Sequence, residues 1–280
     1  MNQLPMSKRV AVVAALVEGN SVRSTARMTN VSKPTILKLL ADLGTACAAF
    51  HNEHVRNVRA QRIQCDECWQ FIGAKAKNVT PEQKAQGWGD CWSWVGIDAD
   101  TKLVVSWFLG SRDAQSAWWF MRDLCSRIIT RVQMTTDGFT AYLPAVEEAF
   151  SSEIDFAQLV KIYGAPRDGA VRYSPARLLH TRPEVIRGNP DPKHISTSFV
   201  ERQNLSMRMG MRRFTRLTNA FSKKAENHAH AVALYFVHYN FARIHGTLRT
   251  TPAMAAGLSN HVWSIEEMVS LLDRASAVAA

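Results

Sequence analysis

Three acidic residues, far apart in the chain, stand where ordinary folding does not favour a carboxylate. Asp66 lies inside "IQCDECWQFIG", residues 63–73, an otherwise largely apolar stretch that predicts a strand. Asp137 ends a second predicted strand, "RVQMTTDGF", and Gly138 follows it where the chain must turn. Glu201 begins a predicted helix in "STSFVERQNLSMRMGMRRF". If the two strands are neighbours and the helix packs across them, the three carboxylates converge.

Converging carboxylates at these positions would form a site for hard divalent cations. Oxygen ligands of this kind, with water and a substrate phosphate, suit Mg²⁺ or Mn²⁺. Crowded carboxylates raise one another's pKa values, and a bound cation removes that cost. Two ions about 3.5–4 Å apart can activate an attacking oxygen and stabilise a leaving one in phosphoryl transfer. Glu67 is adjacent to Asp66 in the strand and is therefore expected on the opposite face of the sheet, outside the site.

Positive charge is concentrated in two parts of the chain. The net charge is +10, and Lys and Arg outnumber Asp and Glu by 6 to 2 in residues 1–50 and by 9 to 2 in residues 201–250. Two separate basic regions suit a polyanion that is bound at two places, and nucleic acid is such a polyanion. A generally basic surface is the alternative reading. The residues predicted to contact DNA are Lys33, Thr35, Lys38, Arg208, Arg212, Arg213, Arg216, Lys223 and Lys224.

The first 46 residues predict a small all-helical domain. Apolar spacing predicts a helix that Gly19 ends, Ser21 can cap a second helix, and Ser32 can cap a third that Gly44 closes. Helix, short turn and helix is the layout of a helix-turn-helix, whose last helix enters the major groove of DNA. Trihelical packing without DNA is the alternative, because such patterns have weak individual specificity.

The remaining chain predicts an α/β domain. Three strands in a meander, a helix, a strand, a helix, a strand and then helices imply a mixed sheet with helices on its faces. Residues 164–192, rich in Arg, Pro and Gly, are expected to form an irregular insertion. The expected domains are a helix-turn-helix over residues 1–46, a linker over 47–62, the α/β domain over 63–250 and a helical tail over 251–280.

Three blocks together resemble the catalytic blocks of DDE transposases, especially those of the insertion-sequence-one type. They are "CDECWQFIGAKAKN", "TTDGFTAYLPAV" and "SFVERQNLSMRMGMRRFTRLTNAFSKK". The resemblance runs from about residue 63 to residue 224, and it is specific only when the blocks are taken jointly. The later "HYNFARIHGTLRTTPAMAAGL" is similar to the closing block of many insertion-sequence transposases and integrases.

The resemblance implies a ribonuclease-H-like fold with Asp66, Asp137 and Glu201 as the metal-binding triad. It also implies Mg²⁺- or Mn²⁺-dependent cleavage at transposon ends, with two ions, and joining of the freed 3′-hydroxyl to target DNA. Double-stranded DNA, as terminal repeats and target, would be the partner. Because two ends must be brought together, a homodimer or larger homo-oligomer is expected. The family's cysteine-rich zinc module ahead of the helix-turn-helix is missing from this sequence, so either the chain is a shorter relative or its end recognition rests on the helix-turn-helix alone.

Other readings of the sequence are less well supported. Cys65 and Cys68 could begin a zinc site, but a second close pair of ligands is missing. The sequence contains neither a G-x-S-x-G elbow nor a P-loop, which argues against a serine hydrolase and against ATP-driven chemistry. Five scattered cysteines and no apolar run long enough for a membrane span suggest a cytoplasmic, nucleoid-associated protein. The competing function is a helix-turn-helix DNA-binding regulator without catalysis, or an inactive transposase derivative.

Overall fold

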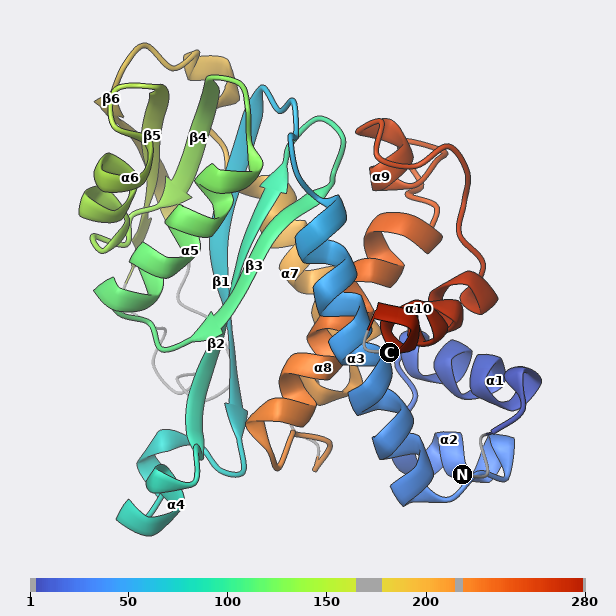
Figure 1. The fold of residues 1–280 in the computed structure, drawn as a ribbon. Coiled ribbons are helices and arrows are strands. Elements are labelled where there is room, and N and C mark those ends of the chain that lie inside the picture. The colour runs from blue at the N-terminus through green and yellow to red at the C-terminus, as the bar shows by residue number, and fades with distance from the viewer. Residues whose placement is uncertain (1–3, 165–177, 215–218, 279–280) are drawn as a thin grey trace.

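The computed structural model describes residues 4–164, 178–214 and 219–278. Within these residues, six strands form one mixed sheet in the order β3-β2-β1-β4-β5-β6 (Figure 1). Neighbouring strands β1–β4 and β4–β5 are parallel, whereas β1–β2, β2–β3 and β5–β6 are antiparallel. The mixed α/β class is therefore confirmed, and the topology is consistent with the ribonuclease-H-like fold that the resemblance implies.

The elements follow one another along the chain as the sequence patterns predict, with some differences. The strands are β1 (Arg62–Ile72), β2 (Gly89–Asp98), β3 (Val104–Gly110), β4 (Val132–Asp137), β5 (Ile154–Tyr163) and β6 (Leu178–Arg187). The α-helices are α1 (Met6–Val17), α2 (Val22–Thr29), α3 (Lys33–His54), α4 (Pro81–Ala85), α5 (Ala114–Arg127), α6 (Tyr142–Phe150), α7 (Ser198–Gly210), α8 (Ala225–Val237), α9 (Pro252–Ala255) and α10 (Ile265–Val278). Short 3₁₀ turns are η1 (Ala76–Asn78), η2 (Pro192–His194) and η3 (Arg212–Phe214), and a π-helical turn, η4 (His238–Ala242), continues α8.

Helices cover the two faces of the sheet differently (Figure 1). Side chains alternate along β1, so Cys65 packs with the helices α5 and α6, while Cys68 packs with α7 and α8. The core residues Trp94 and Phe120 lie on the first face, and Val95 lies on the second. Because Cys65 and Cys68 face opposite sides of the sheet, they do not form a zinc-binding pair.

Helix α3 differs from the expectation that Gly44 ends it. The helix continues through Gly44 to His54, 22 residues in all. A Cβ on Gly44 would lie 2.4 Å from the Cβ of His230 on α8. Gly44 is therefore required by close packing of two helices, and reading it as a stop signal was wrong.

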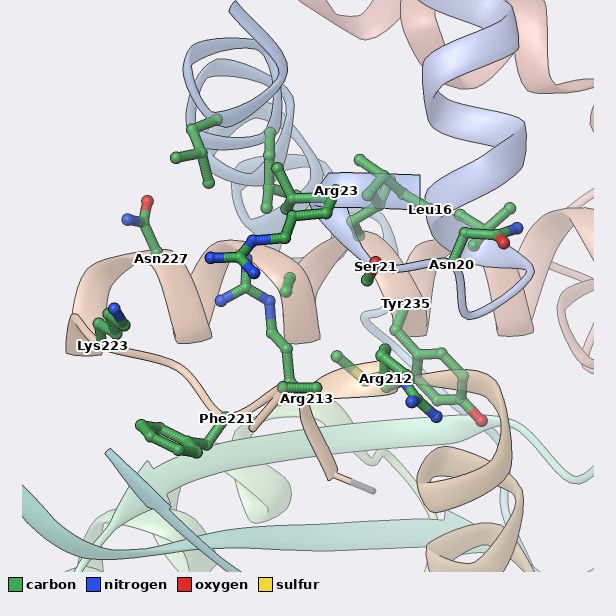
Figure 2. A pocket seen from close by; sticks show the side chains of 18 of the residues that line it. Leu16, Asn20, Ser21, Arg23, Arg212, Arg213, Phe221, Lys223, Asn227 and Tyr235 are labelled. Carbon is green, nitrogen blue, oxygen red and sulfur yellow. The ribbon is translucent and has the colours of Figure 1, made fainter. Parts of the chain in front are cut away.

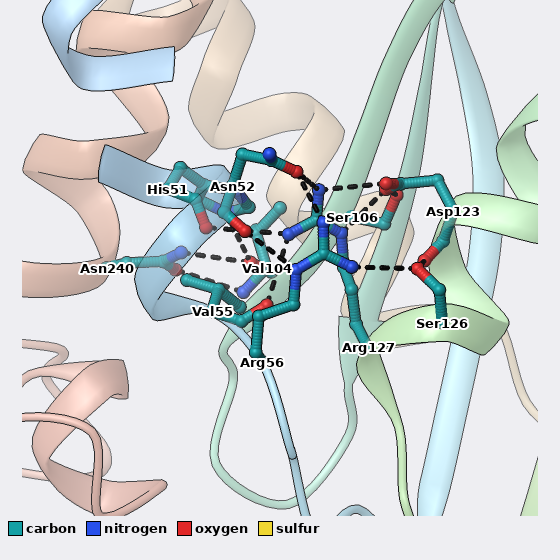
Figure 3. Close-up of polar contacts among 10 residues, drawn as sticks. All are labelled: His51, Asn52, Val55, Arg56, Val104, Ser106, Asp123, Ser126, Arg127 and Asn240. Carbon is teal, nitrogen blue, oxygen red and sulfur yellow. Dashed lines mark hydrogen bonds and ion pairs between the residues drawn. The ribbon is translucent and has the colours of Figure 1, made fainter. Parts of the chain in front are cut away.

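A buried polar network joins α3 to the sheet (Figure 3). The ring nitrogen Nε2 of His51 lies 3.2 Å from the carbonyl oxygen of Val104 on β3, and Asn240 bonds the same residue through both its amide and its carbonyl. Arg127 of α5 donates to the backbone oxygens of His51 and Val55 and pairs with Asp123. These contacts fix the end of α3 against β3, α5 and η4.

A second difference concerns residues 164–192, which were expected to be irregular. Residues 178–187 form strand β6, which pairs with β5 at the edge of the sheet. Pro183 lies inside this strand and is tolerated because an edge strand leaves one row of backbone groups unpaired. The division into domains and the DNA-reading role of α1 to α3 stay predictions. Across the described residues, no helix combines the length and apolarity needed to cross a membrane.

Candidate active site

The parallel pairing of β1 and β4 places two of the three predicted acids side by side. The register pairs Gln64 with Thr135 and Cys65 with Thr136, so Asp66 and Asp137 follow as the next residues on neighbouring strands. Both occur at the positions of their strands that face α7, as alternation along the strands requires. The sheet therefore brings together two carboxylates that are 71 positions apart in the sequence.

The turn after Asp137 is fixed by local contacts. The Oδ1 atom of Asp137 accepts a hydrogen bond of 3.0 Å from the backbone N–H of Phe139. Gln158 on β5 donates to the backbone oxygens of Asp137 and Phe139, at 2.9 and 3.2 Å. A side chain at Gly138 would approach Val160 to 3.3 Å, which is tighter than most contacts of a Cβ atom. Asp137 is thus held by its own turn and by the next strand.

Helix α7 is tied to β1 at two points. The Oε1 atom of the buried Gln64 accepts hydrogen bonds from the backbone N–H groups of Phe199 and Val200, at 2.8 and 3.2 Å. These N–H groups have no partner inside the helix, so Gln64 satisfies them as a cap would. Further along, the side-chain amide of Asn204 donates to Oδ2 of Asp66 at 2.9 Å. Together they place the start of α7 over the carboxylate of Asp66.

Glu201 lies in the first turn of α7, and a protein cation contacts it directly. Its Oε1 atom accepts hydrogen bonds from the Lys161 ammonium of β5 and from the hydroxyl of Thr197. Burial raises the pKa of Asp66, and the positive charge of Lys161 opposes part of that rise. Lys161 therefore interacts electrostatically with both Glu201 and Asp66, whereas Glu201 is not one of the three acids that cluster within 4.8 Å.

Glu67 is closer to the aspartates than the sequence suggested. It does point to the α6 side of the sheet, but one oxygen each of Asp66, Glu67 and Asp137 all lie within 4.8 Å of one another. Its side chain is only 1% exposed, and its Oε2 accepts a 2.9 Å hydrogen bond from Arg112. Leaving Glu67 out of the carboxylate group was wrong, because the long side chain reaches the strand end where Asp137 lies.

Arg112, in the loop after β3, joins the two faces of this group. Its guanidinium contacts Oε2 of Glu67 at 2.9 Å and Oδ2 of Asp137 at 3.3 Å. The same guanidinium lies over the Phe139 ring at 3.9 Å and over the Trp92 ring at 5.4 Å, measured to the ring centroids. Such stacking stabilises a cation beside a ring face. Arg112 thus supplies positive charge to two of the three clustered carboxylates.

Burial and mutual repulsion shift the carboxylates toward their neutral forms. Burial, together with the charge of Asp137, raises the pKa of Asp66 to about 6. The same two causes raise the pKa of Glu67 to about 7, although Arg112 opposes the shift. Burial opposes protonation of Lys161, but its hydrogen bond to Glu201 raises the pKa of that ammonium. The group therefore gains by binding positive charge.

The donor atoms present fit a hard divalent cation. All are oxygens, the ligand type that Mg²⁺ and Mn²⁺ prefer. One buried oxygen near the group, Oδ1 of Asn204, has no hydrogen-bond partner among the described residues. Buried polar oxygens are normally satisfied, so this oxygen is available to a ligand. Asp66 and Asp137 share the most accessible side of the group.

The residues predicted to contact DNA do not form one group. Together with Arg23, five of them line one cavity of about 830 Å³ (Figure 2): Lys33, Arg212, Arg213, Lys223 and Lys224. Thr35 and Lys38 lie elsewhere on α3, where Lys38 pairs with Asp42 at 2.6 Å. Arg208 turns toward the sheet, and its Nε donates to Sγ of Cys68 at 3.2 Å. Arg216 lies outside the described residues.

Comparison with known proteins gives only distant likenesses. Neither a family model nor a curated protein matches the sequence. One similar solved structure is a piggyBac transposase synaptic complex with hairpin DNA, at 11% identity and a TM-score of 0.39, covering 95% of this chain and 69% of that one. Another is a Mos1 transposase paired-end complex with the left transposon end, at 15% identity and a TM-score of 0.22, covering 53% and 58%. At these scores, the site must be argued from its own geometry.

Four residues near the carboxylates were not predicted from the sequence. Lys161 could have been noticed as a lysine inside the apolar strand "FAQLVKIYG". Asn204 could have been noticed because it lies three residues after Glu201, on the same side of the helix. Gln64 and Arg112 carry no sequence signal of this kind, because only tertiary packing brings them to the site.

Proposed function

We propose that the protein is a DNA transposase of the insertion-sequence-one type, with Asp66, Asp137 and Glu201 as its catalytic acids. The supporting observation is the pairing of Asp66 and Asp137 on adjacent parallel strands beneath the start of the helix that carries Glu201. A fold that only needed stability would gain nothing from two partly buried carboxylates side by side, since each disfavours the charge of the other.

The proposed roles follow from the positions of the residues. Asp66 and Asp137 would hold one divalent cation, and Asp66 and Glu201 a second. Those cations would supply Lewis-acid stabilisation of the departing oxygen and a lower pKa for the attacking water. Asn204 orients Asp66 through its 2.9 Å hydrogen bond, and Lys161 holds Glu201 in place. Arg112 balances the charge of Asp137 from the solvent side.

The reaction has two phosphoryl transfers of the same type. In the first, water attacks a phosphodiester at the transposon end, the bond from phosphorus to the 3′-oxygen breaks, and a 3′-hydroxyl and a 5′-phosphate are left. In the second, that 3′-hydroxyl attacks a phosphodiester of target DNA and displaces another 3′-oxygen. Because the second step exchanges one phosphoester bond for another, joining needs no external energy source. Pairing two ends requires at least two copies of the chain.

Purified protein, incubated with a plasmid carrying the DNA that flanks its reading frame, tests the proposal. With Mg²⁺ or Mn²⁺ we expect nicking at short inverted repeats and joining to a second plasmid, and with EDTA we expect neither. Asp137→Ala and Glu201→Ala should remove both reactions while leaving DNA binding within about twofold, since the acids do not contact the cavity residues. Cleavage by Asp137→Ala at the wild-type rate would overturn the assignment.

One observation favours the alternative of a DNA-binding protein without catalysis. Lys161 and Arg112 already contact Glu201 and Asp137, so the carboxylates are partly neutralised within the protein itself. An inactive derivative would retain this arrangement. Isothermal titration with Mn²⁺ distinguishes the two: an active site must bind Mn²⁺ and lose that binding in Asp66→Asn, whereas a regulator has no need to bind it.

A further inference from the structure

The cavity of about 830 Å³ joins two parts of the chain that are distant in sequence. One wall comes from the end of α1, the turn after it and the first residues of α2 and α3, and includes Arg23 and Lys33. The other wall comes from η3, the segment before α8 and α8 itself, and includes Arg213 and Lys223. The cavity has the volume of roughly 28 waters, at about 30 Å³ each in the liquid. It is large enough for a stretch of a polymer backbone.

Cations from both walls point into this cavity. Figure 2 shows the guanidinium groups of Arg23 and Arg213 extending toward its middle from opposite sides. Arg212, Lys223 and Lys224 complete the second wall. Among the lining residues that the structure describes, none is acidic. Six like charges around one space repel one another, and only an anion from outside can remove that cost.

Arg213 is held firmly in this uncompensated position. Its Nη1 donates a 2.9 Å hydrogen bond to the hydroxyl of Ser222, which lies 2.8 Å from Nδ1 of the buried His228. Burial lowers the pKa of the Arg213 guanidinium, and no described carboxylate pairs with it to offset that shift. A partly buried arginine fixed by neutral partners is organised to meet an anion. The neutral network sets its direction without neutralising it.

We propose that this cavity binds the phosphate backbone of a single DNA segment, which cations from both walls contact at once. The inference rests on the proposed function for the choice of DNA as the polyanion. It adds Arg23 to the residues predicted from the sequence. It also makes the N-terminal helices and the segment after α7 two halves of one site instead of two independent ones. DNA held there would continue toward the catalytic acids, because η3 directly follows the helix that carries Glu201.

DNA binding measured in EDTA, over a range of salt, tests the charge of the cavity. In Lys223→Gln/Lys224→Gln, two phosphate contacts are lost, so the slope of log K against log salt should fall by about 2 and Kd should rise roughly 10–30-fold near physiological salt. Arg23→Gln should lower the slope by about 1. The matched control, Lys84→Gln/Lys193→Gln, removes the same charge from exposed positions outside the cavity and should change Kd by less than about threefold.

Phosphate ethylation interference tests whether both walls hold the same DNA. Phosphates whose ethylation blocks wild-type binding should lose their effect in Arg23→Gln and in Lys223→Gln, and the two sets should overlap or adjoin. Sets a full helical turn apart would overturn the single-segment proposal, as would an unchanged salt slope in both variants. These measurements need no divalent cation. If Mg²⁺-dependent cleavage fails, the proposed catalysis is wrong, but the result for DNA binding in the cavity is unaffected. If DNA binding does not depend on the cavity, the proposal for the cavity is wrong, but the proposed catalysis is unaffected.

Discussion

The carboxylate group and the basic cavity carry opposite charges, and they differ in how far those charges are balanced within the protein. Where the end of β4 lies beside the middle of β1, three acids lie within 4.8 Å of one another. Arg112 contacts Glu67 and Asp137 of this group, and Lys161 contacts the nearby Glu201. In the cavity, six cations meet without a described acid among the lining residues. The first region balances much of its charge internally, whereas the second depends on an outside partner.

This difference suggests that the two regions would act one after the other, with the cavity binding DNA before the acids react with it. A cavity with unbalanced positive charge attracts a polyanion over long range and responds to salt. A carboxylate group already contacted by Arg112 gains a cation only by exchanging or adding to an existing contact. Binding would therefore be governed by the cavity and chemistry by the acids, and the two should be separable by mutation.

The largest expected effect separates chemistry from binding. Asp66→Asn should lower cleavage at saturating protein by on the order of 10³-fold or more, because a metal-binding charge is lost at the reacting phosphate. Lowering the salt should not restore the rate. The cavity variant Lys223→Gln/Lys224→Gln should regain nearly the full rate at low salt. Rescue of Asp66→Asn by low salt would contradict the separation. Single-turnover assays at several salt concentrations measure both.

Lowering the pH should change the free energy of unfolding through the two regions in opposite directions. Burial and Arg213 lower the pKa of His228 to about 3, so its contribution to stability is complete above about pH 6.5 and is lost as pH falls, by about 2 kcal/mol near pH 5. Asp66 and Glu67 have raised pKa values of about 6 and 7, so the folded state gains stability as pH falls from about 7.

Urea unfolding at about pH 7.5 and about pH 5 measures these opposing terms. Relative to the wild type, His228→Asn should lose less stability on acidification, because the proton-binding difference at that position disappears. Glu67→Gln should lose more, because the compensating gain is removed. Equal pH dependence in all three proteins would show that the two regions do not differ in this way.

Gln64 holds the start of α7 against β1, so replacing it should impair the acid site and leave DNA binding in the cavity unchanged. Gln64→Leu leaves the N–H groups of Phe199 and Val200 without their acceptor, which should lower the unfolding free energy by about 1–3 kcal/mol. Cleavage should fall, while the salt slope of DNA binding stays at the wild-type value. Gln133→Leu, on the adjacent strand and bonded to Asp191 instead of α7, is the matched control.

The smallest expected effect concerns the internal balance of the acid site. Lys161→Met removes the ammonium from Glu201, whose side chain is 43% exposed and therefore partly screened by water. The loss should be about 0.5–1 kcal/mol in EDTA. Mn²⁺ should then raise the melting temperature more than in the wild type, and Lys161→Arg should behave as the wild type. An identical Mn²⁺ response in Lys161→Met would show that Lys161 does not compete with a cation.

Much of the sheet could be predicted from residue patterns. Strand and helix periodicities are local properties, and the order of elements from β1 to β5 was read from them correctly. The proximity of Asp66 and Asp137 was foreseen as a condition, because it follows once their two strands are neighbours in the sheet. The sequence could not predict how close Glu67 lies to the two aspartates. Its side chain starts on the opposite face of β1, and the position of its carboxylate depends on how that side chain packs.

The differences have physical causes that local patterns do not contain. Gly44 was read as the end of a helix, but it is a glycine because His230 of another helix packs against it. Strand β6 was missed because Pro183 and exposed charges are unusual in a strand, although an edge position tolerates both. The shared cavity could not be predicted either, since it depends on how α2 and α8 meet.

Helix α3 has a mechanical consequence for any DNA bound near its first turn. At 1.5 Å per residue, its 22 residues form a rod about 33 Å long, with Lys33 at one end and the His51 network at the other. Without a break at Gly44, this rod has no joint at which the N-terminal helices could swing independently of the sheet. A duplex would have to bend or rotate to reach the acids, while the protein serves as a fixed template.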